Sequence, residues 1–334
     1  MNNKRNSVDF MHIMPSAMLR TDIHQHLWPE PLIAALTLRR EPPLLRRSAD
    51  GWILRLRDEP ECRFDAADHD PAARATALAR DGMQRALLAI SSPLGIEALP
   101  RDEAAPLLQA HNTSLLALGR PFGVWGAVSL HPPRTADVDD LLDAGAVGIS
   151  LPAGALAGPR GLDRCGGLLE RLERRDAPLL VHPGPGPWRA WRAQPYAEDT
   201  APGWWPAMTR YVADMNAAWH AFAAFGRPQH PRLRVVFAML AGGAPLHGER
   251  LAARGGPAEA ITDARAFYDT SSYGARTTDA VVRCVGIDQL VYGSDRPVVD
   301  PPAGPPPLGA AAAEALAAAN VARLLGHPPL SVAA

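Results

Sequence analysis

The chain has 334 residues, 47% of them hydrophobic, and its acidic and basic side chains balance to a net charge of -1. This length allows two ordinary domains or one large α/β barrel. The near-neutral charge argues against nucleic acid or an anionic membrane as a partner, so we expect a small-molecule substrate. The cysteines Cys62, Cys165 and Cys284 lack C-x-x-C spacing, which argues against a disulfide framework or a thiolate metal site and favours a reducing, cytoplasmic setting.

Residues 1–17 are predicted to form a loose tail ahead of a single domain over residues 18–334. This tail lacks the continuous apolar region of a secretory signal. The rest of the chain contains no apolar run of about 18 residues, the length that a membrane span needs.

The first predicted strand lies in "RTDIHQHLWP", Arg20 to Pro29. Side chains alternate across a β-strand, so His24 and His26 are expected to point to the same face. Two imidazoles on one face can share a metal ion, although H-x-H alone is common by chance. The remaining ligands must therefore come from other strands.

A helix and a hairpin follow this strand. Residues 30–40 have the apolar spacing of a helix, and residues 42–66 place Asp50 and Gly51 between two extended runs. An Asp-Gly pair between such runs is typical of a tight hairpin turn. We therefore predict a small β-hairpin inserted after strand one.

From Ala67 onward, short apolar runs alternate with helical patterns. The runs predict seven further strands, at residues 85–91, 123–129, 146–152, 178–184, 234–240, 266–272 and 289–295. The segments between them predict helices at residues 72–83, 103–118, 137–145, 166–175, 205–225 and 278–286. Eight strands in this alternation favour a (β/α)₈ barrel. An open doubly wound sheet is the alternative, but no G-x-G-x-x-G opens an early helix.

Chemistry is expected where the barrel strands end, because active sites of such barrels lie at the carboxyl ends of their strands. Strand one ends in His24 and His26, strand five in His182 and strand eight in Asp295. Three imidazoles and one carboxylate suit a divalent ion such as zinc. Such an ion lowers the pKa of a bound water toward about 7, and Asp295 is the group expected to accept its proton.

The order of "DIHQH", "LLVHPG" and "VYGSDRP" resembles the amidohydrolase superfamily, in particular its amidohydrolase-related branch with aminocarboxymuconate-semialdehyde-decarboxylase-like enzymes. The segment "AAANVARLLG" around Asn320 resembles the last helix of that branch. This resemblance implies that His24, His26, His182 and Asp295 bind the metal. It also implies that Asp295 handles a proton of the metal-bound water.

Two departures from the family pattern stand out. Two-metal members use a carboxylated lysine on strand four, but the only lysine in this chain is Lys4. Strand six in the family typically ends with a histidine, and this chain has Met239 there. A thioether cannot transfer protons. We therefore expect a one-metal, one-carboxylate site, in which neither His131 nor His247 replaces the missing imidazole.

Substrate contacts are expected from Trp28, Trp188, Met239 and Arg296, which lie near the predicted strand ends. Five of the eight tryptophans fall between strand five and the end of the next helix, namely Trp188, Trp191, Trp204, Trp205 and Trp219. They either wall an apolar substrate or pack against the hairpin or a second copy of the chain in a homodimer. Arg296 either holds a substrate carboxylate or forms an ordinary ion pair.

Three functions remain open from the sequence. The first is a zinc-dependent hydrolase that attacks an amide, lactone or ester-like carbonyl of a small apolar molecule. The second is a non-oxidative decarboxylase, which would use the same motifs. The third is a catalytically silent ligand-binding barrel, against which the retention of all four predicted ligands argues.

Overall fold

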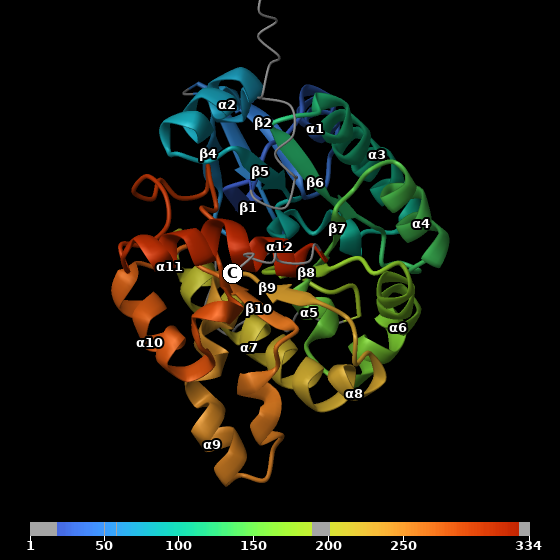
Figure 1. The fold of residues 1–334 in the computed structure, drawn as a ribbon. Coiled ribbons are helices and arrows are strands. Elements are labelled where there is room, and N and C mark those ends of the chain that lie inside the picture. The colour runs from blue at the N-terminus through green and yellow to red at the C-terminus, as the bar shows by residue number, and fades with distance from the viewer. Residues whose placement is uncertain (1–18, 50, 58, 189–200, 327–334) are drawn as a thin grey trace, which may run out of the picture.

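The computed structural model describes residues 19–49, 51–57, 59–188 and 201–326, and its centre is a barrel of eight parallel strands (Figure 1). The order in the sheet is β1-β5-β6-β7-β8-β9-β10-β11. These strands are β1 (Thr21–Gln25), β5 (Arg85–Leu88), β6 (Phe122–Ala127), β7 (Gly148–Pro152), β8 (Leu179–His182), β9 (Val235–Phe237), β10 (Ala266–Asp269) and β11 (Leu290–Val291). The predicted (β/α)₈ barrel is therefore confirmed.

The barrel closes between its first and last strands through single backbone hydrogen bonds. The Ile23 N–H donates to the Tyr292 carbonyl at 2.9 Å, and the Asp295 N–H donates to the His24 carbonyl at 2.9 Å. These bonds hold the segment that carries Asp295 directly beside the first metal motif. Closure thus brings together residues from the two ends of the domain.

Helices cover the outside of the barrel. They are α1 (Glu30–Thr37), α2 (Pro71–Arg80), α3 (Arg101–Leu118), α4 (Thr135–Asp143), α5 (Ala153–Leu156), α6 (Pro159–Arg174), α7 (Val212–Ala221), α8 (Arg227–Gln229), α9 (Gly248–Ala253), α10 (Ala275–Val285), α11 (Ala310–Glu314) and α12 (Asn320–Leu324). Shorter 3₁₀ or π segments are η3 (Ala66–His69), η4 (Ser92–Leu94), η5 (Ile96–Ala98), η7 (Ala207–Tyr211), η8 (Phe222–Gly226), η9 (Met239–His247), η10 (Ala258–Thr262), η11 (Ile287–Gln289) and η12 (Ala315–Ala319). In Figure 1, α9 projects at the lower end of the molecule, away from the barrel.

Helix α6 begins earlier than the sequence pattern predicts, at Pro159 rather than near Gly166. Its first turn contains Pro159 and Gly161, which look like loop residues in a linear reading. Proline is well tolerated in a first helical turn, because the N–H that it lacks would have no partner there. Gly161 is needed there, because a Cβ at that position would lie 2.2 Å from the Ala155 carbonyl oxygen.

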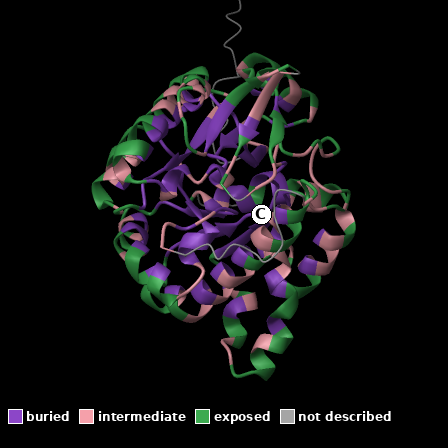
Figure 2. Ribbon diagram, turned by 180° about the vertical axis from the view of Figure 1, so that it is seen from behind, coloured by how far each residue is buried: buried purple, intermediate pink, exposed green. Residues whose placement is uncertain are grey.

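The main core consists of the barrel strands and the inner faces of their helices. Every residue of β1, β7, β8 and β10 is buried, which is typical of parallel strands covered on both faces. Figure 2 shows the buried residues concentrated along the central strands and the exposed ones on the outer helices. Strand residues are therefore fixed by packing, and chemistry is left to their carboxyl ends.

The predicted hairpin over residues 42–66 is present and gains a third strand. Strands β2 (Leu44–Ser48), β3 (Gly51–Arg55) and β4 (Cys62–Phe64) form an antiparallel sheet in the order β2-β3-β4. The link from β3 to β4 is tied to η7, because the Glu59 carboxylate accepts hydrogen bonds from Arg210 and Tyr211, each at 2.7 Å. The small sheet is thus anchored to the segment that precedes α7.

Among the described residues, no helix is both long enough and apolar enough to cross a membrane. The loose tail predicted for residues 1–17, the predicted turn residue Asp50 and the predicted wall residue Trp191 lie outside the described residues.

Candidate metal centre

Four side chains predicted as metal ligands meet at the carboxyl end of the barrel. His24 lies in β1, His26 follows that strand directly, His182 is the last residue of β8, and Asp295 lies in the segment after β11. One potential ligand atom from each residue lies within 4.8 Å of the others. Burial of the three imidazoles is almost complete, and the Asp295 side chain is 14% exposed. The structure therefore places all four predicted ligands in one cluster.

The facing atoms of this cluster are nitrogens and one oxygen. The Nε2 atom of His26 lies 3.1 Å from Nε2 of His24 and 3.2 Å from Nε2 of His182. Oδ1 of Asp295 lies 3.2 Å from Nε2 of His26 and 3.7 Å from Nε2 of His24. Ligands at 2.0–2.1 Å from a tetrahedral zinc ion are about 3.3 Å apart, so these separations fit a single ion.

Each imidazole is oriented by an acceptor on its far side. Nδ1 lies 2.7 Å from Asp269 Oδ2 in His24, 2.9 Å from the Ala89 carbonyl in His26 and 2.8 Å from the Pro183 carbonyl in His182. Because carbonyls only accept, Nδ1 of His26 and His182 carries the hydrogen and Nε2 keeps its lone pair. Such outer acceptors fix the tautomer that a metal ion requires.

The pKa values of the ionisable groups in this cluster are strongly shifted. Burial lowers the pKa of His24, but the carboxylates of Asp269, Asp295 and Asp22 together outweigh burial and raise this pKa to about 9. Burial and the neighbouring His24 and His26 lower the pKa of His182 well below its usual value. Burial alone would raise the pKa of Asp295, but the neighbouring imidazoles of His26, His24 and His182 hold it at about 2. A proton on His24 can satisfy only some of the lone pairs on the facing Nε2 atoms and on Asp295 Oδ1. A divalent ion can bind all of these atoms and displace that proton.

Asp269, the last residue of β10, is a supporting residue that the sequence analysis did not single out. It is fully buried, and its Oδ1 accepts hydrogen bonds from the Met239 N–H at 2.9 Å, the Ser271 N–H at 3.0 Å and the Ser271 hydroxyl at 2.5 Å. Its Oδ2 remains for His24. The available signal was that Asp269 is the one carboxylate within the predicted strand over residues 266–272.

The backbone at Gly293 approaches this pair closely. A Cβ at this position would lie 2.8 Å from the His24 Cβ and 3.1 Å from Asp269 Oδ2. The glycine in "VYGSDRP" is therefore needed for the fit between the last strand and the His24–Asp269 pair.

Met239 follows β9 almost directly and is half-buried with a φ of +45°. Its N–H is bonded to Asp269, so its backbone is tied to the support of the metal site. Both His131 and His247 are exposed, and neither belongs to the four-residue cluster among the described residues.

The other residues expected to contact substrate are held by the protein itself. Trp28 is 6% exposed, and its indole stacks on Phe64 and His69 with ring centroids 5.0 and 5.2 Å away. Arg296 donates to Asp81 at 3.0 Å and to Asp300, which corresponds to the ion-pair alternative.

The tryptophans of the predicted wall divide into buried and exposed ones. Trp188 is half-buried against the main core, with the Arg164 guanidinium 5.1 Å from its ring centroid. Trp219 is buried and donates to the Tyr268 hydroxyl at 2.9 Å. Trp204 and Trp205 are 59% and 43% exposed.

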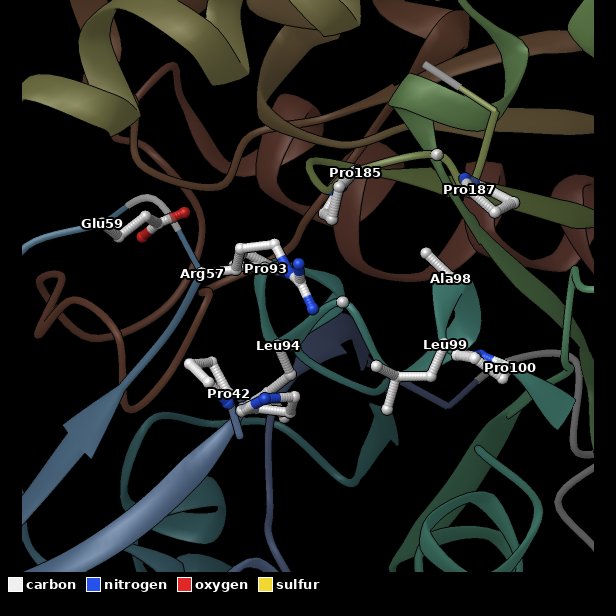
Figure 3. Close-up of a pocket in the computed structure, with 13 residues that line it drawn as sticks. Pro42, Arg57, Glu59, Pro93, Leu94, Ala98, Leu99, Pro100, Pro185 and Pro187 are labelled. Carbon is white, nitrogen blue, oxygen red and sulfur yellow. The ribbon is translucent and has the colours of Figure 1, made fainter. Parts of the chain in front are cut away.

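A cavity of about 250 Å³ lies between the small sheet and the segments that follow β5 and β8 (Figure 3). Six prolines give it rigid apolar walls, and the Arg57 side chain reaches in beside Pro93 and Leu94 (Figure 3). The lining is formed by Pro42, Pro43, Arg57, Glu59, Pro93, Leu94, Gly95, Ala98, Leu99, Pro100, Pro185, Gly186 and Pro187. No metal ligand lines this cavity, although Pro185 follows His182 closely in the chain.

Comparison with known proteins gives a family and a set of similar folds. The family model described as "Amidohydrolase" matches residues 21–330. No curated protein matches the sequence. The fold is similar to that of Metarhizium anisopliae IDCase, with a TM-score of 0.75, 16% identity and coverage of 92% of this chain and 97% of that one.

Two further solved structures are similar in fold. For 2,6-dihydroxybenzoate decarboxylase from Rhizobium, the TM-score is 0.63 at 15% identity, over 92% of this chain and 98% of that one. For 5-carboxyvanillate decarboxylase from Novosphingobium aromaticivorans, complexed with manganese and 4-hydroxy-3-methoxy-5-nitrobenzoic acid, the TM-score is 0.67 at 13% identity, over 92% and 96% of the two chains.

Proposed function

The chain belongs to the amidohydrolase family, and we propose that it is a metal-dependent decarboxylase of a small aromatic carboxylate with a hydroxyl group beside the carboxylate. Similar solved structures include enzymes named for 2,6-dihydroxybenzoate and 5-carboxyvanillate, which favours decarboxylation. Hydrolysis of an ester-like carbonyl, expected first from the sequence, becomes the second candidate. Both reactions would use the same ligand set.

The observation that carries the proposal is a single carboxylate, Asp295, beside three imidazoles that face it through Nε2. Hydrolysis needs a base for the attacking water and an acid for the leaving group, and Met239 stands where the family typically has a histidine. Decarboxylation needs only one proton, delivered to one carbon atom. A site with one proton carrier suits that requirement.

His24, His26, His182 and Asp295 would hold one divalent ion, and zinc is the ion that this donor set suits. The ion would supply positive charge that binds the substrate's carboxylate and neighbouring oxygen and stabilises negative charge as the reaction proceeds. A cytoplasmic setting is part of the proposal, because the three cysteines lack any disulfide pattern.

Asp295 acts as the proton carrier in this scheme. Its carboxylate accepts the proton of the substrate's hydroxyl group and then passes it to the ring carbon that bears the carboxylate. The bond between that carbon and the carboxylate then breaks, its electron pair restores the aromatic ring, and CO₂ leaves. The products are a phenolate and CO₂, so charge and atoms balance without an added oxidant or reductant.

Substrate contacts other than Asp295 belong to the same proposal. Met239 offers an apolar wall, because it follows β9 at the end of the barrel where the ligands meet. Arg296 would have to leave Asp81 and Asp300 before it could bind a carboxylate, so we assign it a structural role. Trp28 and Trp188 are proposed to shape the rim of the site rather than to contact the reacting atoms.

The test is a parallel assay on protein that contains one equivalent of zinc or manganese. Release of CO₂ from 2,6-dihydroxybenzoate, 2-hydroxybenzoate and 5-carboxyvanillate is compared with hydrolysis of aryl esters, lactones and anilides. In D₂O, the product should carry deuterium at the carbon that lost CO₂. Asp295→Asn should abolish release, and the surface variant Asp279→Asn should not.

Each alternative has its own result. Hydrolysis without CO₂ release would overturn the proposal in favour of the hydrolase. Stoichiometric metal binding with neither activity, across the whole substrate panel, would favour the silent ligand-binding barrel.

A further inference from the structure

Backbone strain is concentrated at the carboxyl end of the barrel. Among the described non-glycine residues with positive φ, all but Asp176 lie in the segments after β9, β10 and β11, namely Met239, Leu240, Ala241, Ser272 and Asp295. Residues held in this region of φ/ψ space cluster at functional sites, because the surrounding structure must maintain them. Ser272 is the member of this group that lies near the metal centre and has no role in the scheme above.

Ser272 contacts a metal ligand directly. Its φ is +65°, and its hydroxyl donates to Oδ2 of Asp295 at 3.0 Å. The other oxygen of the same carboxylate, Oδ1, faces Nε2 of His26 at 3.2 Å. The two oxygens of Asp295 are therefore distinguished: one faces the imidazoles, and the other is bonded to Ser272.

The segment that carries Ser272 is fixed by the support of the first metal motif. The N–H of Ser271 and its hydroxyl both donate to Asp269 Oδ1, while Asp269 Oδ2 bonds His24. The Thr270 N–H donates to the Val291 carbonyl at 3.1 Å. One short segment thus orients His24 through Asp269 and Asp295 through Ser272.

We propose that Ser272 is a positioning residue that restricts Asp295 to binding the metal through Oδ1 alone. A carboxylate can bind a cation through one or both oxygens. The hydroxyl of Ser272 satisfies Oδ2 with a charge-assisted hydrogen bond, which makes binding through both oxygens less favourable. One coordination position then stays open for substrate, and Oδ2 stays available as the proton carrier. The effect on rate rests on the proposed decarboxylation, but the effect on metal binding does not.

The experiment compares three variants in protein loaded with cobalt(II). Ser272→Ala removes the hydroxyl and keeps the strained backbone, whereas Ser272→Gly removes the hydroxyl and relieves the strain. Thr270→Val is the matched control, because the buried Thr270 hydroxyl has no hydrogen-bond partner among the described residues. The visible absorption of bound cobalt reports the coordination number, since it weakens as that number rises.

We expect the visible band of cobalt to weaken in Ser272→Ala and Ser272→Gly alike, and to stay as in the wild type in Thr270→Val. If the proposed reaction is correct, both serine variants should also lose about 10- to 100-fold in kcat/KM, as is usual when a partner of a metal ligand is removed.

The spectrum decides the proposal. An unchanged cobalt band in both Ser272→Ala and Ser272→Gly would overturn it, whatever the rates show. A change in Ser272→Ala that Ser272→Gly lacks would also overturn it, because backbone strain rather than the hydroxyl would then be the cause. If the wild type releases no CO₂, the proposed function fails, while the spectral comparison still tests the role of Ser272.

Discussion

At the scale of single residues, Glu97 is a fully buried carboxyl group that takes no part in the proposed reaction. It lies in η5, and the Ser92 hydroxyl donates to its Oε1 at 2.5 Å. Its Oε2 has no hydrogen-bond partner among the described residues. Burial raises the pKa of Glu97 from 4.5 to about 7, against the lowering effect of Ser92. The carboxyl group of Glu97 therefore binds its proton more tightly in the folded protein than in the unfolded chain.

This shift predicts a pH dependence of stability. Between pH 4.5 and about 7 the folded state holds a proton that the unfolded state has lost, so the contribution of Glu97 to the free energy of unfolding falls as pH rises. Across the whole window the loss is about 3 kcal/mol. Urea unfolding should show that Glu97→Gln removes this part of the slope and is more stable than the wild type above pH 7. Parallel curves for the two proteins would contradict the assignment.

Gly293 allows a second residue-scale prediction. In Gly293→Ala, the new methyl group would meet His24 and Asp269 and displace the imidazole from its orientation. We expect metal affinity, measured by competition with a chelator, to fall by about 10- to 100-fold. Gly274→Ala is the control, because a Cβ there meets no atom within 4 Å. Equal affinities in the two variants would show that the site tolerates the shift.

At the scale of elements, the turn after β9 shows how a strand end is held in place. Five consecutive residues have positive φ, from +45° at Met239 to +82° at Gly243. Asn216 on α7 donates to the carbonyl of Gly242 at 2.9 Å, and Asp269 accepts from the N–H of Met239. Hydrogen bonds from α7 and β10 therefore hold a left-handed turn, a conformation that residues with side chains normally disfavour.

A pair of alanines in η9 tests the cost of this turn. Ala241 and Ala244 are both fully buried, but only Ala241 has a left-handed φ, +54°. Ala244→Gly should lose about 1–2 kcal/mol of stability through the lost methyl and the freer unfolded chain. Ala241→Gly should be close to neutral, because it also relieves a left-handed strain of about 1–2 kcal/mol. Guanidinium unfolding measures both, and equal losses would argue against strain at Ala241.

At the scale of the whole molecule, the metal centre joins both ends of the barrel. His24 lies on the first strand, His26 directly after it, His182 on the fifth and Asp295 beyond the eighth. An ion bound by all four would link these segments only in the folded state. Metal binding should therefore stabilise the entire domain.

The corresponding prediction concerns thermal unfolding. At a free metal concentration of about 100 times Kd, the stabilisation should be about 2.7 kcal/mol. Calorimetry should show that addition of a chelator lowers the midpoint of the wild type. His182→Ala should be insensitive to the chelator, whereas His230→Ala, which changes an imidazole outside the ligand cluster, should respond like the wild type. A midpoint of the wild type that ignores both metal and chelator would mean that the site does not bind the ion.

Several features of the site were determined by the sequence alone. Alternation in "DIHQH" put His24 and His26 on one face, and the alternation of apolar runs with helical patterns predicted the barrel that joins them to His182 and Asp295. Local periodicity carries this information, because burial on both faces selects apolar strands wherever they occur. The predicted ends of the strands were less exact. Strand β11 ends at Val291, so Asp295 lies in the segment after the strand rather than at its end.

Other features were decided only by the tertiary structure. Asp269 at the end of β10 bonds His24 on β1, and Ser272 after β10 bonds Asp295 after β11. No local sequence pattern specifies the distance between side chains that lie so far apart in the chain. Arg296 illustrates the same point: the sequence left a substrate clamp and an ion pair open, and Asp81, brought close by the fold, forms an ion pair with its guanidinium. Sequence thus determined which residue types stand at the strand ends. Packing and barrel closure decided which of them contact one another, because those contacts depend on the positions of several strands at once.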